Sequence, residues 1–424
     1  MHPLLDDVAR THGDLTTVTA LRRALQQHRG PLVSPLDDGT VTVTFVWFAD
    51  TAPDAAGSTV SLQCGLADHS GRAVAMTHLD ATPVWIHEVV CTPDAIVSYR
   101  FVVDDPFAGA ANLGDREFQQ LMLAAQARSF ADPFNPRRIA PLAVLFGLPV
   151  PDTQFESVLQ LADAPEAAWF EPHDAPAGRL ESFDLTSTAL GNTRTITVHT
   201  PAGRSAPHPL PVAILLDGSS FLQIAQLPRA LDMAVHHGHL APCHVAFVSE
   251  PHGGGGFANR TVELSCNPRH AQMLVHELLP QLRHRFDIAS SPDDVVLGGA
   301  SLGGLASTYT ALEHAPAIGN VLSISGSYWF GAERDGQPEW LTRRFAEGPT
   351  HTFRIHQQIG NLEDSPLALS PGVSHLVANR HFRDVAVAKG HRVQYIEDTT
   401  AHDVVAFRLA AMRGLIDLLP GATP

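Results

Sequence analysis

The chain has 424 residues, of which 44% are hydrophobic, and its 44 acidic and 28 basic residues give a formal net charge of −16. This charge argues against nucleic acid or an anionic membrane as a partner, because both need a cationic face. The apolar runs are too short to cross a bilayer and the N-terminus lacks the pattern of a secretory leader, so a cytoplasmic location without membrane insertion is expected.

The first part of the chain has the pattern of an all-β domain. Four short, β-branched or alternating runs between residues 40 and 104 are separated by Asp, Pro and Gly, which predicts an immunoglobulin-like sandwich over 1–130. A short helix is expected at 115–129. Residues 131–180 are rich in proline and are predicted to form a linker.

From residue 181 the pattern changes to strands that alternate with helices. This alternation predicts a catalytic domain over 181–424, built on a mostly parallel sheet with helices on both faces. Strands are expected at "RTITVHTP", "PVAILLDG", "CHVAFVSE", "VVLGGAS", "NVLSISG", "TFRIHQQIG" and "RVQYIED", and helices near 221–237, 268–286, from 302, near 373–389 and near 402–418.

One serine in this domain has the context of a nucleophile. Ser301 lies in Gly299-Ala300-Ser301-Leu302-Gly303, a G-x-S-x-G pattern between an expected buried strand and an expected helix. A serine at such a sharp turn has a strained backbone, so its neighbours two residues away must be small. The pattern predicts the nucleophile elbow of an α/β-hydrolase.

A serine nucleophile needs a base and an acid, and in this fold they follow it along the chain. His402 lies after the last expected strand and is the predicted base, whereas His391 precedes that strand and belongs at the other edge of the sheet. Glu363 follows the preceding strand and is the preferred acid, with Asp364 as the alternative.

The oxyanion hole requires two backbone N–H groups near the nucleophile. Leu302 is expected to supply one, and the loop after "PVAILLDG" the other, from Gly218 or Ser219. A glycine-rich run at 251–256, "PHGGGG", resembles an oxyanion motif of some lipases. It follows the strand immediately before the elbow rather than the one before that, so we interpret it as a loop near the pocket.

Two groups of residues are candidates for substrate binding. Arg260 is expected in a loop with Glu263, and Tyr328 and Trp329 follow the next strand. An arginine beside aromatic rings suits a flat anionic ligand. A loop ion pair and ordinary core aromatics explain the same residues equally well.

The sequence carries no sign of a metal site. The four cysteines, Cys64, Cys91, Cys243 and Cys266, lie far apart without C-x-x-C spacing, which predicts reduced thiols and neither zinc nor a disulfide framework. No resident cofactor is expected.

Several motifs together resemble one family. "VTFVWF", "DPFNPR", "LGNTRTITVHTP", "NRTVELSCN", "GGASLGGLAS", "SISGSYWF" and "AHDVVAFRLAAMRGLIDLL" occur in the order seen in the enterochelin (ferric enterobactin) esterases, which are cytoplasmic. The resemblance implies an N-terminal sandwich and an esterase-D-like α/β-hydrolase domain. It also implies that Ser301 is the nucleophile, His402 the base and Glu363 the acid, and that Arg260 helps to hold an anionic catecholate.

The resemblance implies hydrolysis of the lactone esters of a ferric tri-catecholate siderophore, with iron arriving as part of the substrate. Two alternatives remain open. The first domain also resembles the glycan-binding sandwich of glycogen-branching enzymes, which suits a feruloyl or acetyl esterase acting on carbohydrate. A siderophore-binding protein without hydrolytic activity is the other.

Overall fold

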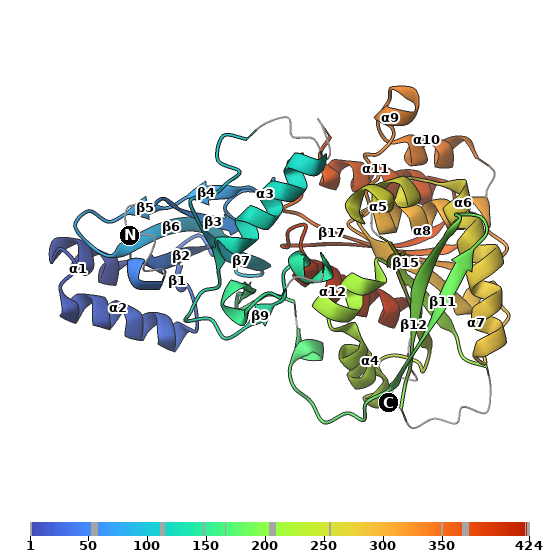
Figure 1. Ribbon diagram of the computed structural model, residues 1–424, viewed down its shortest axis with the longest axis horizontal. Coiled ribbons are helices and arrows are strands. Elements are labelled where there is room, and N and C mark those ends of the chain that lie inside the picture. Colours follow the sequence, from blue (N-terminus) through green and yellow to red (C-terminus); the bar gives the residue numbers. More distant parts are fainter. Residues whose placement is uncertain are drawn as a thin grey trace. The chain divides into compact units, whose positions relative to one another are not determined.

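The chain forms two compact units (Figure 1). The computed structural model describes residues 2–51, 58–110, 115–146, 149–165, 167–202, 209–253, 256–348, 351–366, 373–419 and 421. The first unit comprises residues 1–165 and 398–405, and the second comprises 166–397 and 406–424. The main boundary lies within the expected linker, and the first unit extends well beyond its expected end at residue 130.

The first unit contains a sandwich of two antiparallel sheets, as the sequence predicts. One sheet has the strand order β1-β2-β6-β5, and the other has the order β4-β3-β7-β10-β9 with β8 paired to β7. Rings from the two sheets meet between them, with centroids of Phe45 and Tyr99 5.0 Å apart and those of Trp47 and Phe101 5.2 Å apart. The strands are β1 (Leu32–Pro35), β2 (Val41–Phe48), β3 (Val60–Cys64), β4 (Ala73–Ala75), β5 (Thr77–His78), β6 (Val84–Cys91), β7 (Ile96–Val103), β8 (Ser129–Phe130), β9 (Arg138–Ile139) and β10 (Glu156–Gln160).

The first unit also has helices at its N-terminus that were not predicted. Helices α1 (Pro3–Arg10) and α2 (Leu15–His28) share a hydrophobic cluster with residues of β2 and β6. The signal was present, because Val18, Leu21 and Leu25 follow helical spacing and Asp14 accepts a 2.8 Å hydrogen bond from the Thr17 N–H as an N-cap. The predicted helix at 115–129 is α3 (Asp115–Ala127).

Much of the expected linker at 131–180 belongs to the first unit, which extends to residue 165. Strand β10 pairs with β7, and the buried carboxylate of Asp132 accepts a 2.7 Å hydrogen bond from the Tyr99 hydroxyl. The prolines in this stretch suggested a connection without packing of its own. Its buried polar and apolar side chains instead complete the sandwich.

The second unit contains a sheet with the strand order β11-β12-β14-β13-β15-β16-β17-β18. The pairs from β14 through β13, β15 and β16 to β17 are parallel, whereas β11 and β12 pair antiparallel at one edge. Strand β11 was not predicted. The strands are β11 (Arg179–Ser187), β12 (Asn192–Thr200), β13 (Val212–Leu216), β14 (His244–Pro251), β15 (Val295–Ala300), β16 (Asn320–Ile324), β17 (Arg354–Gly360) and β18 (Arg392–Asp398).

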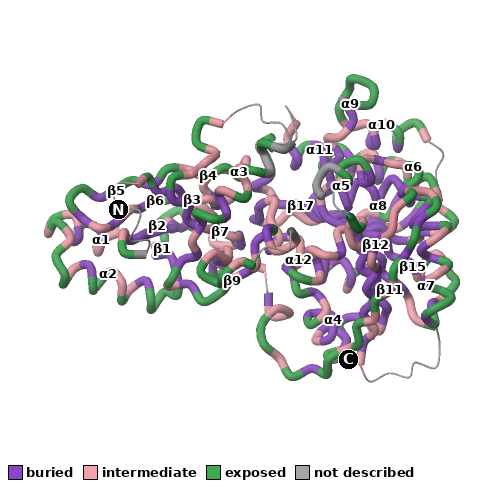
Figure 2. Tube along the Cα trace, in the orientation of Figure 1, coloured by how far each residue is buried: buried purple, intermediate pink, exposed green. Residues whose placement is uncertain are grey.

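The centre of this sheet is buried on both faces (Figure 2). Every residue of β13, β15 and β16 is buried, which explains why β13 is a continuous apolar run and why β15 and β16 are mostly apolar or small residues. One core cluster joins alternate residues of these strands to the helices between α5 and α11, and Gly414 of α12 packs against Leu322 on β16. The helices are α4 (Leu227–His236), α5 (Gly256–Leu264), α6 (Pro268–Gln272), α7 (Leu279–Arg285), α8 (Leu302–Glu313), α9 (Ala332–Asp335), α10 (Trp340–Glu347), α11 (His375–Ala388) and α12 (Val404–Leu418), with π-helical turns at Ser220–Ile224 and Met273–Leu278.

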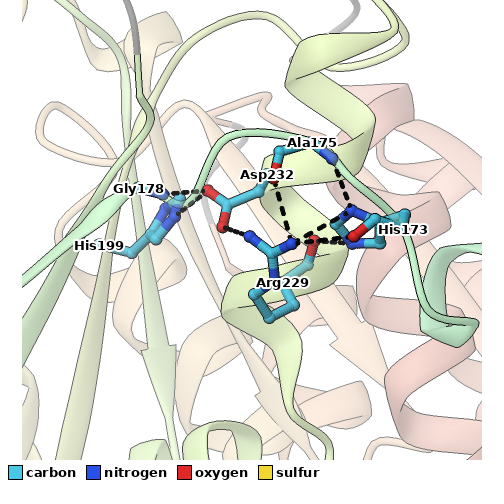
Figure 3. Close-up of polar contacts among 6 residues, drawn as sticks. All are labelled: His173, Ala175, Gly178, His199, Arg229 and Asp232. Carbon is cyan, nitrogen blue, oxygen red and sulfur yellow. Dashed lines mark hydrogen bonds and ion pairs between the residues drawn. The ribbon is translucent and has the colours of Figure 1, made fainter.

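A polar network around the buried Asp232 holds the start of the second unit against its sheet (Figure 3). The Asp232 carboxylate on α4 accepts hydrogen bonds from the Gly178 N–H at 2.9 Å and from Arg229 at 3.1 Å, and it lies 2.8 Å from His199 Nε2 on β12. Arg229 also donates to the carbonyl of Ala175. The segment leading into β11 is thereby fixed to the sheet.

Across the described ranges, no helix combines the length and the apolar character needed to span a membrane. All four cysteines are free thiols.

Candidate active site

Ser301 stands at a strained turn between β15 and α8. Its backbone has φ 58° and ψ −120°, a region that residues with a side chain rarely adopt. The turn is held by hydrogen bonds from the Ser301 N–H to the Ile324 carbonyl at 2.8 Å and from the Ser327 N–H to the Ser301 carbonyl at 3.0 Å. This geometry supports the prediction of a nucleophile elbow.

The glycines on either side have the steric role expected of them. A Cβ on Gly299 would lie 2.9 Å from the carbonyl carbon of Gly303, closer than side chains tolerate. A Cβ on Gly303 would lie 3.2 Å from Asp217 Oδ2. The G-x-S-x-G spacing therefore follows from close packing between the strand end, the first turn of α8 and the loop after β13.

Glu363 and Asp364 have different environments, although they are adjacent in the sequence. Glu363 is fully buried, and its Oε1 accepts hydrogen bonds from the Ser325 hydroxyl at 2.7 Å and from the Gly360 N–H at 3.0 Å. Asp364 is exposed. A triad acid must hold one orientation away from water, so the structure favours Glu363.

Three titratable side chains form a compact group. Glu363, His375 and His402 each offer a potential ligand atom, and these atoms all lie within 4.8 Å of one another. His375 Nε2 lies 2.7 Å from the Ser325 carbonyl and must carry a proton there, while its Nδ1 accepts a 3.2 Å hydrogen bond from the Trp329 indole. Both ring nitrogens are thus engaged, so the group suits an acid–base pair supported by His375 better than a metal site.

His402 lies in the loop between β18 and α12, as predicted, and is half-buried. Residues 398–405, which contain this loop, belong to the first unit. There the Ile96 N–H donates to the Thr399 carbonyl at 3.0 Å, and the Ser98 N–H donates to Asp403 Oδ2 at 2.8 Å. The loop that carries His402 is therefore held by β7, far away in the sequence.

The loop after β13 lies at the same end of the sheet as the elbow, where an oxyanion hole is expected. Strands β13 and β15 pair directly and in parallel, so their carboxyl ends lie side by side. Leu302 is the first residue of α8, where a backbone N–H has no partner within the helix. Gly218 must be glycine, since a Cβ would lie 2.5 Å from the Val248 nitrogen. The Ser219 hydroxyl instead donates to Glu250 at 2.6 Å.

The competing glycine-rich run at 251–256 follows β14, which β13 separates from β15. Gly254 and Gly255 lie outside the described residues. His252 forms a turn beside β12, with its N–H donating to the Thr193 carbonyl at 2.8 Å. The strand order therefore supports the loop at Gly218 over this run.

Arg260 and Glu263 lie on helix α5 and not in a loop, which corrects the expectation from sequence. They also do not pair with each other. Arg260 forms a two-pronged ion pair with Asp217, whereas Glu263 is buried against Arg194 at 2.8 Å. Their position after the strand "CHVAFVSE" suggested a loop, but α5 packs against β14 and α8.

The two aromatic candidates have different roles in the structure. Tyr328 is fully buried, stacks on Phe382 with centroids 3.9 Å apart, and is hydrogen-bonded through its hydroxyl to Ser323 and Thr308. It is a core residue and offers no surface to a substrate, so its predicted binding role is withdrawn. Trp329 is partly exposed and donates to His375.

Sequence reasoning missed Asp217, Ser325 and His375. Asp217 directly follows a buried strand that precedes the elbow strand, a position that could have marked it. Ser325 and His375 reach Glu363 and its surroundings from different elements. Only the fold brings them together.

The site's geometry can be set beside known proteins. Residues 187–418 match a family model described as "Putative esterase", and residues 42–170 match the model "Enterochelin esterase, N-terminal". The chain is 27% identical over 418 residues to the iron(III) enterobactin esterase of Dickeya dadantii, covering 93% of this chain and 91% of that protein. It is 24% identical over 422 residues to the iron(III) salmochelin esterase of Escherichia coli O6:H1, covering 96% and 95%.

Solved structures agree with the fold. A ferric enterobactin esterase from Salmonella typhimurium superimposes with a TM-score of 0.76 at 23% identity, covering 92% of this chain and 96% of that one. The enterobactin esterase of Shigella flexneri, crystallised in the presence of enterobactin, gives 0.73 at 24% identity, covering 93% and 96%. The two-unit architecture is therefore one already seen in solved proteins.

Proposed function

Because the chain belongs to the esterase family whose model matches more than half of its length, we propose that it hydrolyses the lactone esters of ferric tri-catecholate siderophores of the enterobactin type. The single observation that carries the chemistry is the strained, positive-φ turn at Ser301. Glu363 and His402, the proposed acid and base, lie together in one compact group with His375. The substrate class is supported by the N-terminal match and by the relatives that span nearly the whole chain.

The proposed reaction begins with attack on a lactone carbonyl. Ser301 Oγ bonds to the carbonyl carbon while His402 takes the hydroxyl proton, and Glu363 keeps the imidazole oriented and balances its charge. The backbone N–H groups of Leu302 and Gly218 donate hydrogen bonds to the developing oxyanion. Collapse of the tetrahedral intermediate breaks the ester bond, and His402 returns the proton to the departing alcohol.

Water then completes the cycle. His402 removes a proton from water as it attacks the acyl-serine, and a second tetrahedral intermediate releases the carboxylic acid and restores Ser301. The enzyme needs no cofactor of its own in this scheme, since the iron enters and leaves with the ligand. We place the reaction in the cytoplasm, where four unpaired cysteines remain reduced.

The test is to incubate the purified protein with iron-loaded and iron-free cyclic tri-catecholate and with a feruloyl sugar ester, and to follow the products by mass. The wild type should open the siderophore ring. In the Ser301→Ala variant the rate of ring opening should be lower by about 10⁴- to 10⁶-fold.

Two outcomes contradict the proposal. Cleavage of only the feruloyl ester would identify a carbohydrate esterase. Tight siderophore binding without products from either ester would identify a binding protein.

A further inference from the structure

A partly buried ion pair connects the loop after β13 to the elbow. Arg260 Nε donates to Asp217 Oδ1 at 2.6 Å, and its Nη2 donates to Asp217 Oδ2 at 2.7 Å. The same Nη2 lies 3.5 Å from the carbonyl of Ala300, the residue before the nucleophile. The side chains of Arg260 and Asp217 are 17% and 10% exposed. One guanidinium thus contacts both segments that build the site.

Asp217 holds an unusual backbone conformation. It directly follows β13 with φ 57°, and its carbonyl accepts the Ser220 N–H at 3.0 Å, which starts the π-helical turn. Its carboxylate also lies over the elbow helix, as the 3.2 Å approach to a Cβ on Gly303 indicates. The next residue is Gly218, whose N–H is the proposed oxyanion donor. Any rotation at Asp217 therefore redirects that N–H.

The charge of the pair matters as much as its geometry. A bare carboxylate beside an oxyanion hole would oppose the negative charge that forms in the reaction. Burial acts against the charge on Arg260, but Asp217 outweighs it and raises the pKa of the guanidinium. The arginine therefore stays charged and neutralises Asp217.

We propose that Arg260 and Asp217 are positioning residues. Their two-pronged ion pair keeps the Gly218 N–H oriented toward the place where the oxyanion forms when Ser301 attacks. Arg260 then acts on the oxyanion hole and not as the receptor for the catecholate anion that the family resemblance implies. This inference rests on the proposed ester hydrolysis but not on which ester is cleaved.

The experiment compares two esters on the same variants. The anionic ferric tri-catecholate and the neutral p-nitrophenyl acetate are assayed with Asp217→Asn and Arg260→Met. Each variant should lower kcat by about 10- to 100-fold on both esters, with KM changed by less than about twofold. The reason is that a misdirected N–H donor stabilises the transition state less well, whichever ester is cleaved. The variant that carries both substitutions should lose little more kcat than Arg260→Met alone, because it leaves no unpaired carboxylate at position 217.

The exposed pair Arg343–Asp335 in the same unit provides the matched control. Arg343→Met and Asp335→Asn should leave both activities within about twofold of the wild type. Asp217→Asn keeps the size and shape of the side chain and removes only its charge. Thermal unfolding checks that each variant is folded.

One result would overturn the inference. If Arg260→Met raises only the KM of the ferric siderophore and leaves p-nitrophenyl acetate turnover unchanged, Arg260 is a substrate receptor. If the wild type fails to open the siderophore, the proposed function fails, while the neutral ester still tests the positioning role.

Discussion

The nucleophile and the base of the proposed triad are held in different ways. Ser301 is fixed by residues near it in the chain, through the close packing of Gly299 against Gly303 and through hydrogen bonds with Ile324 and Ser327. The loop of His402 is fixed by residues about three hundred positions away, where β7 and Asp94 bind its backbone and side chains. One half of the site is a local motif, and the other depends on contacts within the first unit.

Acid should weaken the unit that carries the elbow. His270 lies on α6, which packs on the elbow helix α8, and burial lowers its pKa from 6.5 to about 4, assisted by Arg194. Between these values the unfolded chain binds a proton that the folded chain does not. Stability should therefore fall by up to about 3 kcal/mol as the pH drops from 6.5 to 4.

The measurement is denaturant unfolding across that pH range. His270→Gln should flatten the slope, whereas His28→Gln, an exposed position in the first unit, should leave it intact. An unchanged slope in His270→Gln would assign the acid sensitivity to other groups.

The elbow can be disturbed by one methyl group. Gly299→Ala places a Cβ 2.9 Å from backbone that cannot move aside easily, so Ser301 must shift. We expect a loss of about 10²-fold in kcat, measured with p-nitrophenyl acetate. Near-normal turnover would mean that the elbow tolerates displacement and that its sterics are not decisive.

Gly65 has a comparable position beside the loop that carries His402, the proposed base. A Cβ there would clash with the Ala401 Cβ, next to His402. Gly65→Ala should push this loop and lower kcat by about 10-fold, less than Gly299→Ala because a loop can yield further. Kinetics on the same ester provide the comparison, and an equal or larger loss than in Gly299→Ala would reverse the ranking.

The smallest effect is expected from one hydrogen bond. Asp94 Oδ2 accepts the Thr399 hydroxyl at 3.0 Å. Asp94→Ala should lower kcat by about 3- to 10-fold, the usual worth of such a bond, without changing KM.

Asp38→Ala is the control for Asp94→Ala. This substitution removes the hydrogen bond that the Thr40 N–H donates to Asp38 within a turn of the same unit, and it should leave kcat unchanged. Equal losses in both variants would point to general destabilisation of the sandwich.

The sequence predicted the elements of the second unit well, because each depends on local patterns. Buried strands appear as continuous apolar runs, and Ser301 with its glycines follows a steric rule that operates over five residues. Two of the errors lie where packing overrides local signals. Arg260 and Glu263 are helical despite the surrounding glycines, and the proline-rich stretch after residue 130 contributes β10 to the sandwich.

The sequence alone predicted Ser301 as the nucleophile, the chain order of the proposed triad and the change from sandwich to alternating strands and helices. Only the tertiary structure distinguished Glu363 from Asp364, since burial separates two adjacent carboxylates. It also assigned Tyr328 to the core, paired Arg260 with Asp217 and attached the His402 loop to the first unit. These features depend on contacts between residues far apart in the chain, which no local pattern encodes.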